Sequence, residues 1–401
     1  MPTTTTDEIQ AREARHILQT YRRAPVTFVR GQGVRLYDAE GREYLDLLSG
    51  IGVASLGHAH PGLARAIADQ AQTLIHTSNL FYHPLQGQAA ERLATLSGLP
   101  RVFFCNSGTE AVEACLKFAR RYWYTRGEPR KEIIALEESF HGRTFGALSV
   151  TSDHHYRAPF EPLVPGVRFV PVNDPQALLA AVSRSTGAII AEPIQGEGGV
   201  RPLTPAFAAA ITEACQKTGA LLIADEVQSG LGRTGQPFYF SALGLKPHLV
   251  SVGKALGGGV AVGAALVSQE VADTISFGDH GSTYGGNLLA CRAALVFLDE
   301  LVSGELLAHI GRVGRHFEQR LKAVAARHAF VKEVRGSGLI WGLELTRDAG
   351  PVVPLALEKG VIVNRTAETV VRLLPPLVIT EPDVDEALNR LDAALSAVGA
   401  T

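Results

Sequence analysis

A single lysine stands between an apolar segment and a run of glycines. Residues 249–253 are apolar or small, and Lys254 then leads into three glycines at 257–259. Upstream, another apolar segment ends in Asp225. A lysine in a dry pocket has its charged form disfavoured, which suits a nucleophile that forms a Schiff base. A carboxylate nearby suits the ring nitrogen of a pyridine cofactor, so Lys254 and Asp225 are the predicted catalytic residues of a pyridoxal phosphate site.

A possible phosphate site lies where an apolar segment meets a helical pattern. Ser107, Gly108 and Thr109 connect the segment 102–105 to a helix predicted over 109–123. The N-terminus of a helix offers free N–H groups and a positive dipole end, and glycine lets the backbone approach closely. Taken alone, these residues are better explained as a helix cap with Ser107 or Thr109 as the N-cap residue. The lysine and aspartate downstream favour the phosphate site.

Further side chains are predicted to contact the cofactor ring. Phe140 and His141 follow another apolar segment and a short loop, so an aromatic side chain there would stack on the ring face. For Phe140 alone, packing in the core is the better explanation. Val227 and Gln228 follow Asp225 directly, and Gln228 would reach the ring hydroxyl.

Two arginines are candidate binding groups for substrate carboxylates. Arg143 lies close to the predicted ring-stacking segment, and Arg372 interrupts an otherwise apolar strand pattern. A guanidinium group in either place offers a planar fork to a carboxylate. Glu197, within a glycine-rich segment, would neutralise one of them when no second carboxylate is bound. Structural ion pairing explains these charges equally well.

Seven short apolar segments alternate with helical patterns from about residue 100 onward. They are predicted strands at 102–105, 133–136, 167–170, 188–191, 221–224, 249–252 and 264–267. Segments that are apolar on both faces belong in a sheet covered by helices on both sides. The pattern therefore predicts an α/β fold with a mostly parallel seven-stranded sheet, whose sites lie at the carboxyl ends of the strands.

Both ends of the chain are expected to build a smaller α+β domain. Alternating apolar and polar residues around an acidic-glycine turn predict a β-hairpin over 34–47. Beyond residue 290, a long helical stretch leads to strand patterns at 331–345 and 370–374 and to a terminal helix. We therefore divide the chain into a disordered tail (1–12), an N-terminal segment of the small domain (13–55), a large cofactor-binding domain (56–290) and a C-terminal small-domain segment (291–401).

Composition excludes several classes of protein. The chain has 401 residues, nearly half of them hydrophobic, which is enough for two or three domains. A net charge of −2 without a dense basic stripe argues against binding to nucleic acid. No apolar run reaches transmembrane length, and the first residues do not form a secretory signal, so we predict no membrane partner. Four widely spaced cysteines without a CxxC motif indicate buried thiols, a cytoplasmic location and no metal site.

Five motifs occur in the order found in one enzyme family. From about residue 57 to residue 376 the sequence resembles the class III (ω-amino) pyridoxal phosphate aminotransferases. One visible departure is Ser229, where the family often has threonine. Residues 76–82 and 280–287 resemble in particular the members that act on N-acetylornithine. The five motifs are Asn106-Ser107-Gly108-Thr109-Glu110-Ala111, Phe140-His141-Gly142-Arg143-Thr144, Glu192-Pro193-Ile194-Gln195-Gly196-Glu197-Gly198-Gly199, Asp225-Glu226-Val227-Gln228-Ser229-Gly230 and Lys254-Ala255-Leu256-Gly257-Gly258-Gly259.

The resemblance implies the type I pyridoxal phosphate transferase fold in a homodimer with both active sites at the subunit interface. It assigns the cofactor contacts to the residues singled out above and adds Thr283, which would reach the phosphate of the neighbouring subunit's cofactor. Ser282 and Arg143 would hold the acetylornithine end, and Arg372 would hold the α-carboxylate of glutamate. Glu197 would neutralise Arg372 between the two half-reactions.

The implied activity is transfer of the δ-amino group of N-acetylornithine to 2-oxoglutarate, giving N-acetylglutamate 5-semialdehyde and glutamate in arginine biosynthesis. Ornithine, succinylornithine, 4-aminobutyrate or a carrier-linked lysine are alternative donors, because one or two pocket contacts decide among them. A decarboxylase, racemase or aminomutase would not need the Glu197 and Arg372 pair. A pyridoxal-binding regulator usually carries a DNA-binding module, and none is visible. A nicotinamide enzyme is disfavoured because Pro237, not a helix, follows the G-x-G-x-x-G match at 230–235.

Overall fold

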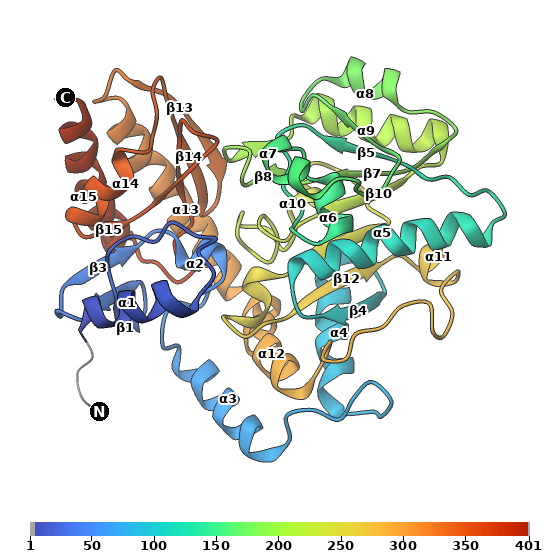
Figure 1. Cartoon of the computed structure of the whole chain (residues 1–401), viewed down its shortest axis with the longest axis horizontal. Coiled ribbons are helices and arrows are strands. Elements are labelled where there is room, and N and C mark those ends of the chain that lie inside the picture. Colours follow the sequence, from blue (N-terminus) through green and yellow to red (C-terminus); the bar gives the residue numbers. More distant parts are fainter. Residues whose placement is uncertain (1–4, 400–401) are drawn as a thin grey trace.

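The computed structural model describes residues 5–399, and a seven-stranded sheet forms the core of its larger part (Figure 1). Four adjacent pairs of strands in this sheet are parallel, and β12 alone is antiparallel to its neighbours β11 and β4. All seven predicted strands and the mostly parallel arrangement are confirmed. In sheet order the strands are β4 (Arg101–Cys105), β12 (Gly263–Val267), β11 (Leu249–Val252), β10 (Leu221–Asp225), β7 (Thr186–Ala191), β5 (Glu132–Leu136) and β6 (Val167–Val170).

Helices cover both faces of this sheet. Odd positions of β10, such as Ile223, pack with Val112 of α5 on one face, while Leu222 packs with Phe207 of α9 on the other. Alternate side chains of a strand point to opposite faces, so a strand buried on both sides must be apolar throughout. The helices of this part are α3 (Pro61–Thr73), α4 (Pro84–Ser97), α5 (Gly108–Thr125), α6 (Phe145–Val150), α7 (His154–Arg157), η1 (Ala158–Phe160), α8 (Pro175–Ala181), α9 (Pro205–Thr218), α10 (Tyr239–Ala242), η2 (Lys254–Gly257), α11 (Gln269–Ala272) and α12 (Leu288–Ser303).

The smaller part of the molecule joins the two ends of the chain. In Figure 1 the first strands lie beside the C-terminal elements, and Leu45 of β3 pairs in parallel with Val361 of β15. Its first sheet has the order β1 (Phe28–Gln32), β2 (Arg35–Asp38), β3 (Glu43–Asp46) and β15 (Val361–Ile362). Its second sheet has the order β13 (Val331–Ser337), β14 (Ile340–Leu345), β17 (Val370–Leu373) and β16 (Asn364–Thr366). Helices α2 (Ser49–Gly52), α13 (Glu305–Ala325), α14 (Val352–Glu358) and α15 (Glu381–Gly399) and the two-stranded pair β8 (Ile194–Gln195) and β9 (Arg201–Pro202) complete the fold.

The predicted hairpin over 34–47 is therefore present as β2 and β3. The domain boundaries at 55/56 and 290/291 stay predictions. Helix α12 runs through the second boundary and packs against α3 and α4, so this helix belongs by its contacts to the larger part. The nicotinamide-type match at 230–235 forms turns, as expected from Pro237, and the next helix is the four-residue α10.

The prediction of a disordered tail over residues 1–12 is wrong for its second half. Helix α1 (Thr6–His16) begins there, and Thr5 and Glu8 form a capping box in which each side chain bonds the other residue's backbone N–H. Reciprocal capping satisfies two otherwise unpaired donors of a helix start. Acidic residues in the first turn and basic residues in the last also suit the helix dipole. Residues 1–4 lie outside the described residues.

Three further observations bear on a membrane span, on the cysteines and on the histidines at 58 and 60. No helix within residues 5–399 is long and apolar enough to cross a membrane. The four cysteines are free thiols, three of them buried. His58, which has no acidic neighbour in the sequence, contacts Asp46 at 2.8 Å between Nε2 and Oδ2, and His60 is the N-cap of α3.

Candidate active site

The sheet brings Lys254 and Asp225 to the same edge. Asp225 is the last residue of β10 and is in register with Ser251 of the parallel strand β11. Lys254 follows β11 and opens η2 with a φ of 40°. A non-glycine residue at positive φ costs free energy, and such residues concentrate at functional sites. Asp225 thus ends one strand and Lys254 closely follows another, as predicted, and the structure adds that the two strands are neighbours.

Asp225 is held rigidly inside the molecule. Its carboxylate is 4% exposed, and Oδ1 accepts hydrogen bonds from Ser251 Oγ at 3.0 Å and from Val227 N at 3.1 Å. Oδ2 lies 2.6 Å from Nδ1 of His141, which is buried as well. A buried carboxylate is expensive unless it is fully paired, and these contacts supply the pairing.

His141 carries a positive charge more readily than a free histidine. Burial lowers the pKa of His141, but the hydrogen bond and the charge of Asp225 outweigh burial, so the pKa lies above its usual value. Among the described residues, no hydrogen-bond partner faces His141 Nε2, although this atom is buried. His141 therefore holds the Asp225 carboxylate through Nδ1, while its Nε2 has no partner among the described residues.

The predicted phosphate loop is a cradle of close backbone contacts. Ser107 is the N-cap of α5 and accepts from Glu110 N at 3.3 Å, so the capping explanation holds. A Cβ on Gly108 would lie 2.6 Å from Val227 Cγ1, and a Cβ on Gly253 would lie 3.0 Å from the Cα of Gly108. Only glycine at these positions lets the helix N-terminus, the segment after Asp225 and the lysine turn meet. The start of α5 lies in this cradle, and a helix N-terminus suits a phosphate.

Thr109 connects this loop to the predicted ring-stacking segment. Its Oγ1 lies 2.9 Å from Thr144 Oγ1 and accepts from Arg143 N at 3.3 Å. The Arg143 guanidinium is stacked 3.5 Å over the ring of Tyr156, whose edge in turn meets Phe140. No pattern in the sequence predicts the Tyr156 contact. Arg143 is exposed, so it can still bind a substrate carboxylate, and that role stays a prediction.

A second carboxylate on this site is paired with a buried arginine. Arg372, 1% exposed, donates from Nη1 to Glu197 Oε1 at 2.5 Å and to Gln228 Oε1 at 3.1 Å. Nε of Arg372 also donates to Asn364 Oδ1 at 3.2 Å, a partner that the sequence analysis missed. Gln228 Nε2 also donates to Glu197 Oε1 at 3.4 Å, so this bond and the one from Arg372 place Gln228 in the same network. Its predicted contact with the ring hydroxyl stays a prediction.

The charges of Glu197 and Arg372 also act on the pKa of Lys254. Burial lowers the pKa of Lys254, the Glu197 carboxylate opposes this, and Arg372 adds to it, so the pKa lies below its usual value. Burial would raise the pKa of Glu197, but Arg372 and Lys254 lower it more strongly. The result is an amine that loses its proton readily beside a carboxylate that keeps its charge, as a Schiff-base lysine requires.

The two residues predicted to act across a subunit interface lie together on a loop. Ser282 Oγ accepts from Asn106 Nδ2 at 3.3 Å and from Gly285 N at 3.0 Å, so the loop borders the phosphate cradle of its own chain. Thr283 next to it is exposed. The roles predicted for both residues depend on a second subunit and stay predictions.

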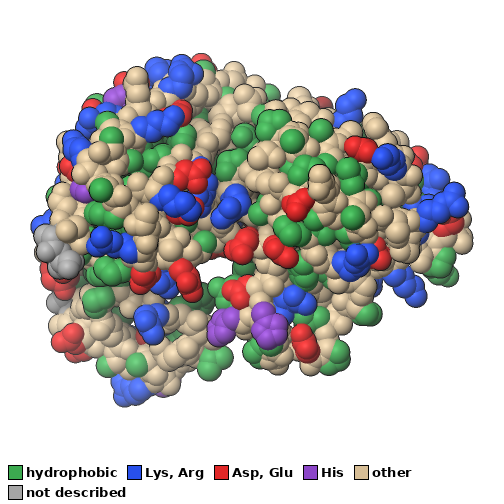
Figure 2. All heavy atoms as spheres, turned by 90° about the horizontal axis from the view of Figure 1, so that it is seen from above, with side chains coloured by type: hydrophobic (Ala, Val, Ile, Leu, Met, Phe, Trp, Pro, Cys, Tyr) green, Lys and Arg blue, Asp and Glu red, His purple; other side chains and the backbone are tan. Residues whose placement is uncertain are grey.

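A cleft of about 790 Å³ opens beside Phe140 and Glu197. Phe140 and Tyr156 line one part of it, and Glu197, Arg365 and Thr366 line another. Thr366 Oγ1 donates to the backbone carbonyl of Glu197, which ties β16 to the glycine-rich segment. Figure 2 shows carboxylates and basic side chains gathered around a hollow in one face of the molecule. The cleft therefore offers aromatic faces and charged groups to a small polar substrate.

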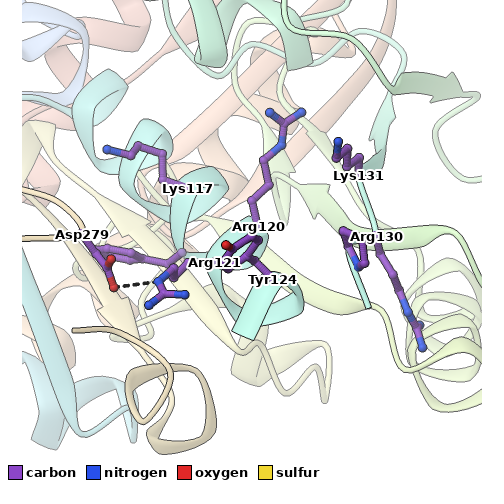
Figure 3. Close-up of a pocket in the computed structure, with 9 residues that line it drawn as sticks. Lys117, Arg120, Arg121, Tyr124, Arg130, Lys131 and Asp279 are labelled. Atoms are coloured by element: carbon purple, nitrogen blue, oxygen red, sulfur yellow. Dashed lines mark hydrogen bonds and ion pairs between the residues drawn. The ribbon is translucent and has the colours of Figure 1, made fainter. Parts of the chain in front are cut away.

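A separate cavity of about 380 Å³ lies against α5 and is rich in cations (Figure 3). The charge of this cavity is already engaged: Arg121 pairs with Asp279 at 2.8 Å, and Arg130 donates to the carbonyl of Thr218 at 2.5 Å. In Figure 3 the charged ends of Arg120 and Arg130 point in different directions. The cations do not converge on one point, so we assign no substrate to this cavity.

The residues around Lys254 fit pyridoxal phosphate. The unpaired His141 Nε2 and the Asp225 carboxylate are polar groups in the interior of the protein. The cradle around Gly108 leaves space that a Cβ on Gly108 would fill. Sequence reasoning missed Ser251, whose contact with Asp225 follows from strand register. It also missed Glu192, which is buried among these groups.

Comparisons with known proteins agree with this geometry. The model of the family "Aminotransferase class-III" matches residues 17–395. The acetylornithine aminotransferase of Aquifex aeolicus is 46% identical over 377 residues, covering 94% of this chain and 98% of that protein. The acetylornithine aminotransferase of Methanocaldococcus jannaschii is 44% identical over 390 residues, covering 96% and 97%.

A solved structure extends the likeness to three dimensions. The ornithine aminotransferase of Toxoplasma gondii, solved with partial occupancy of PLP at its active site, is 33% identical with a TM-score of 0.94 and covers 99% of this chain and 95% of that one. Such a match over nearly the whole chain confirms the type I fold and the cofactor. The chain belongs to the class III aminotransferases and depends on pyridoxal phosphate.

Proposed function

We propose that this protein transfers the δ-amino group of N-acetylornithine to 2-oxoglutarate, giving N-acetylglutamate 5-semialdehyde and glutamate. The Arg372–Glu197 contact carries the proposal. A transaminase must bind two different substrates in turn, and glutamate brings a second carboxylate that the ω-amine does not place at the same point. A carboxylate that covers an arginine, and can leave it, meets that need. The names of the most similar relatives support N-acetylornithine as the donor.

The chain's own residues would perform the chemistry in simple steps. The bound cofactor supplies an electron sink for the pair released when a C–H bond breaks. Lys254 Nζ, whose lowered pKa favours the neutral amine, accepts the proton from the carbon that carries the amino group. It would later deliver that proton to the bound cofactor, so that the proton moves between the substrate carbon and the cofactor. Asp225 keeps a negative charge behind the site, with His141 and Ser251 holding its orientation.

We also propose that the protein acts as a homodimer in a cytoplasmic setting. Large apolar side chains are exposed near Ser282 and Thr283, which suits a protein partner. The free thiols suit a reducing compartment. The exposed side chains are Leu80 (85%), Phe81 (68%), Tyr82 (107%), Phe277 (110%) and Tyr284 (63%).

A screen of single half-reactions tests the donor. The cofactor-loaded protein is mixed with one amine at a time, and the change in the visible absorbance of the cofactor is followed. We expect fast change with N-acetylornithine and slow change with ornithine and 4-aminobutyrate. A faster reaction with ornithine would transfer the assignment to that donor, which the Toxoplasma structure makes the leading alternative.

The same screen with Lys254→Ala tests the mechanism. Loss of the proton-transferring amine should slow the half-reaction by about 10³-fold or more, since positioned acid–base groups contribute roughly 10²–10⁴ and the nucleophile is lost too. Lys131→Ala is the matched control, because Lys131 is exposed on the outside of the molecule. Full activity of Lys254→Ala would refute the proposed chemistry.

A further inference from the structure

Glu192 is a buried carboxylate for which the proposed chemistry has no step. It follows the last residue of β7, and its side chain is 5% exposed. Oε1 accepts a hydrogen bond from the backbone N–H of Phe140 at 2.9 Å. Oε2 accepts one from the backbone N–H of Gly196 at 3.1 Å. One side chain thus holds two segments that come from different strand ends.

These two segments carry opposite parts of the site. Phe140 precedes His141, which contacts Asp225. Gly196 precedes Glu197, which pairs with Arg372. Because adjacent residues share a peptide unit, a shift of either N–H moves the functional side chain beside it. Glu192 is therefore placed to set the distance between the cofactor side and the substrate side.

We propose that Glu192 is a positioning residue that couples the Phe140–His141 segment to the Gly196–Glu197 segment through its two carboxylate oxygens. The functions of the two coupled segments rest on the proposed function, but the coupling itself is a property of the fold. Both bonds are buried, and a hydrogen bond is stronger in the low dielectric of the interior than in water. Burial raises the pKa of Glu192 to about 7, which agrees with a carboxylate placed for structure at some cost.

Glu226 provides a matched control. It is equally buried, 1% exposed, and burial raises its pKa to about 7 as well. Its oxygens accept from Ser229 Oγ at 2.6 Å and from Phe240 N at 2.7 Å, so it holds neither of the two segments. The same substitution at both positions therefore separates the coupling from the general cost of changing a buried acid.

Amide hydrogen exchange measured by mass spectrometry on the cofactor-loaded protein tests the proposal. Glutamine at position 192 has one oxygen and one NH₂, so it can accept from only one of the two backbone N–H groups. In Glu192→Gln we expect exchange at Phe140, at Gly196 or at both to be about 10-fold faster or more, in line with the loss of a buried hydrogen bond. Glu226→Gln should leave both amides at the wild-type rate.

Steady-state kinetics supplies a second readout. If the coupling holds, Glu192→Gln lowers kcat and raises KM for 2-oxoglutarate together. Unchanged exchange at both amides, or equal acceleration in the control, would overturn the proposal. If Glu192→Gln does not fold, Glu192→Asp takes its place, because it keeps the charge and loses reach. Exchange requires no substrate, so failure here is distinct from failure of the proposed donor.

Discussion

Two carboxylates flank Lys254, and they are built differently. Asp225 is 4% exposed and bonded by Ser251, Val227 and His141, all from rigid strand ends or the loops beside them. The side chain of Glu197 is 33% exposed and is held mainly by one arginine. The orientation of the Asp225 carboxylate is therefore fixed when the chain folds. The second can exchange its protein partner for solvent.

The difference matches the two demands of a transaminase. The cofactor stays in place through every cycle, so its partner gains from rigidity and exclusion of water. The substrates alternate, so the group that covers Arg372 must release it within each cycle. Burial and the number of hydrogen bonds thus separate the constant half of the site from the half that switches.

Removing the constant charge should have the largest effect. Asp225→Asn keeps the shape but loses the charge that raises the pKa of His141, so the pKa of His141 falls as well. We expect kcat to fall by about 10²–10³-fold, the usual range for a lost preorganised electrostatic group. Steady-state rates at saturating substrates measure this, with Asp279→Asn, a surface carboxylate paired with Arg121, as control. A fall below threefold would show that Asp225 is structural.

Removing the switching charge should affect one half-reaction more than the other. Glu197→Gln removes the negative charge that pairs with Arg372, so dicarboxylates still bind while the ω-amine meets a cation whose charge is uncompensated. We expect kcat/KM for the amine to fall by about 10-fold, roughly 1.4 kcal/mol, and KM for 2-oxoglutarate to change by less than about threefold. Glu138→Gln, on the wall of the same cleft, is the control. Equal losses in both half-reactions would contradict a switching role.

The smallest effect concerns stability against pH. The pKa of Glu197 is lower in the folded protein than its usual value of 4.5. An acid of this kind stabilises the fold above its unfolded pKa and loses that contribution as pH falls through the folded pKa. The difference in unfolding free energy between wild type and Glu197→Gln should be constant from about pH 6 to 8 and shrink below about 4.5. Chemical denaturation at several pH values measures it, and a difference that grows in acid would refute the pairing.

The sequence was most informative where one segment carries the whole signal. Residues 188–191 are apolar on both faces, so they had to form an interior strand, and they do so in β7. Lys254 and Asp225 stand out because a charge at the end of such a segment has few structural explanations. The capping box of α1 is also visible in the sequence, as Thr5 followed three residues later by Glu8.

Contacts between segments could not be predicted in the same way. Ser251 reaches Asp225 because β10 and β11 pair in one particular register, which the sequence does not state. Tyr156 of α7 lies under Arg143, and Asn364 of β16 reaches Arg372 because the two residues are register partners in the β16–β17 pair. The sequence states neither the path of α7 nor this register. Glu192 belongs to a visible motif, yet its role appears only when two distant N–H groups meet at its oxygens.

The pairing of β3 with β15 has a consequence for how the chain is made. Leu45 is synthesised early, but its partner Val361 emerges only when most of the protein already exists. Until then the edge of β3 that β15 covers is open, because β2 occupies only its other edge. Open strand edges invite pairing with other chains. A chain that ends before residue 361 would therefore leave this edge of β3 unpaired and open to other chains. The C-terminal segment thus protects an N-terminal strand.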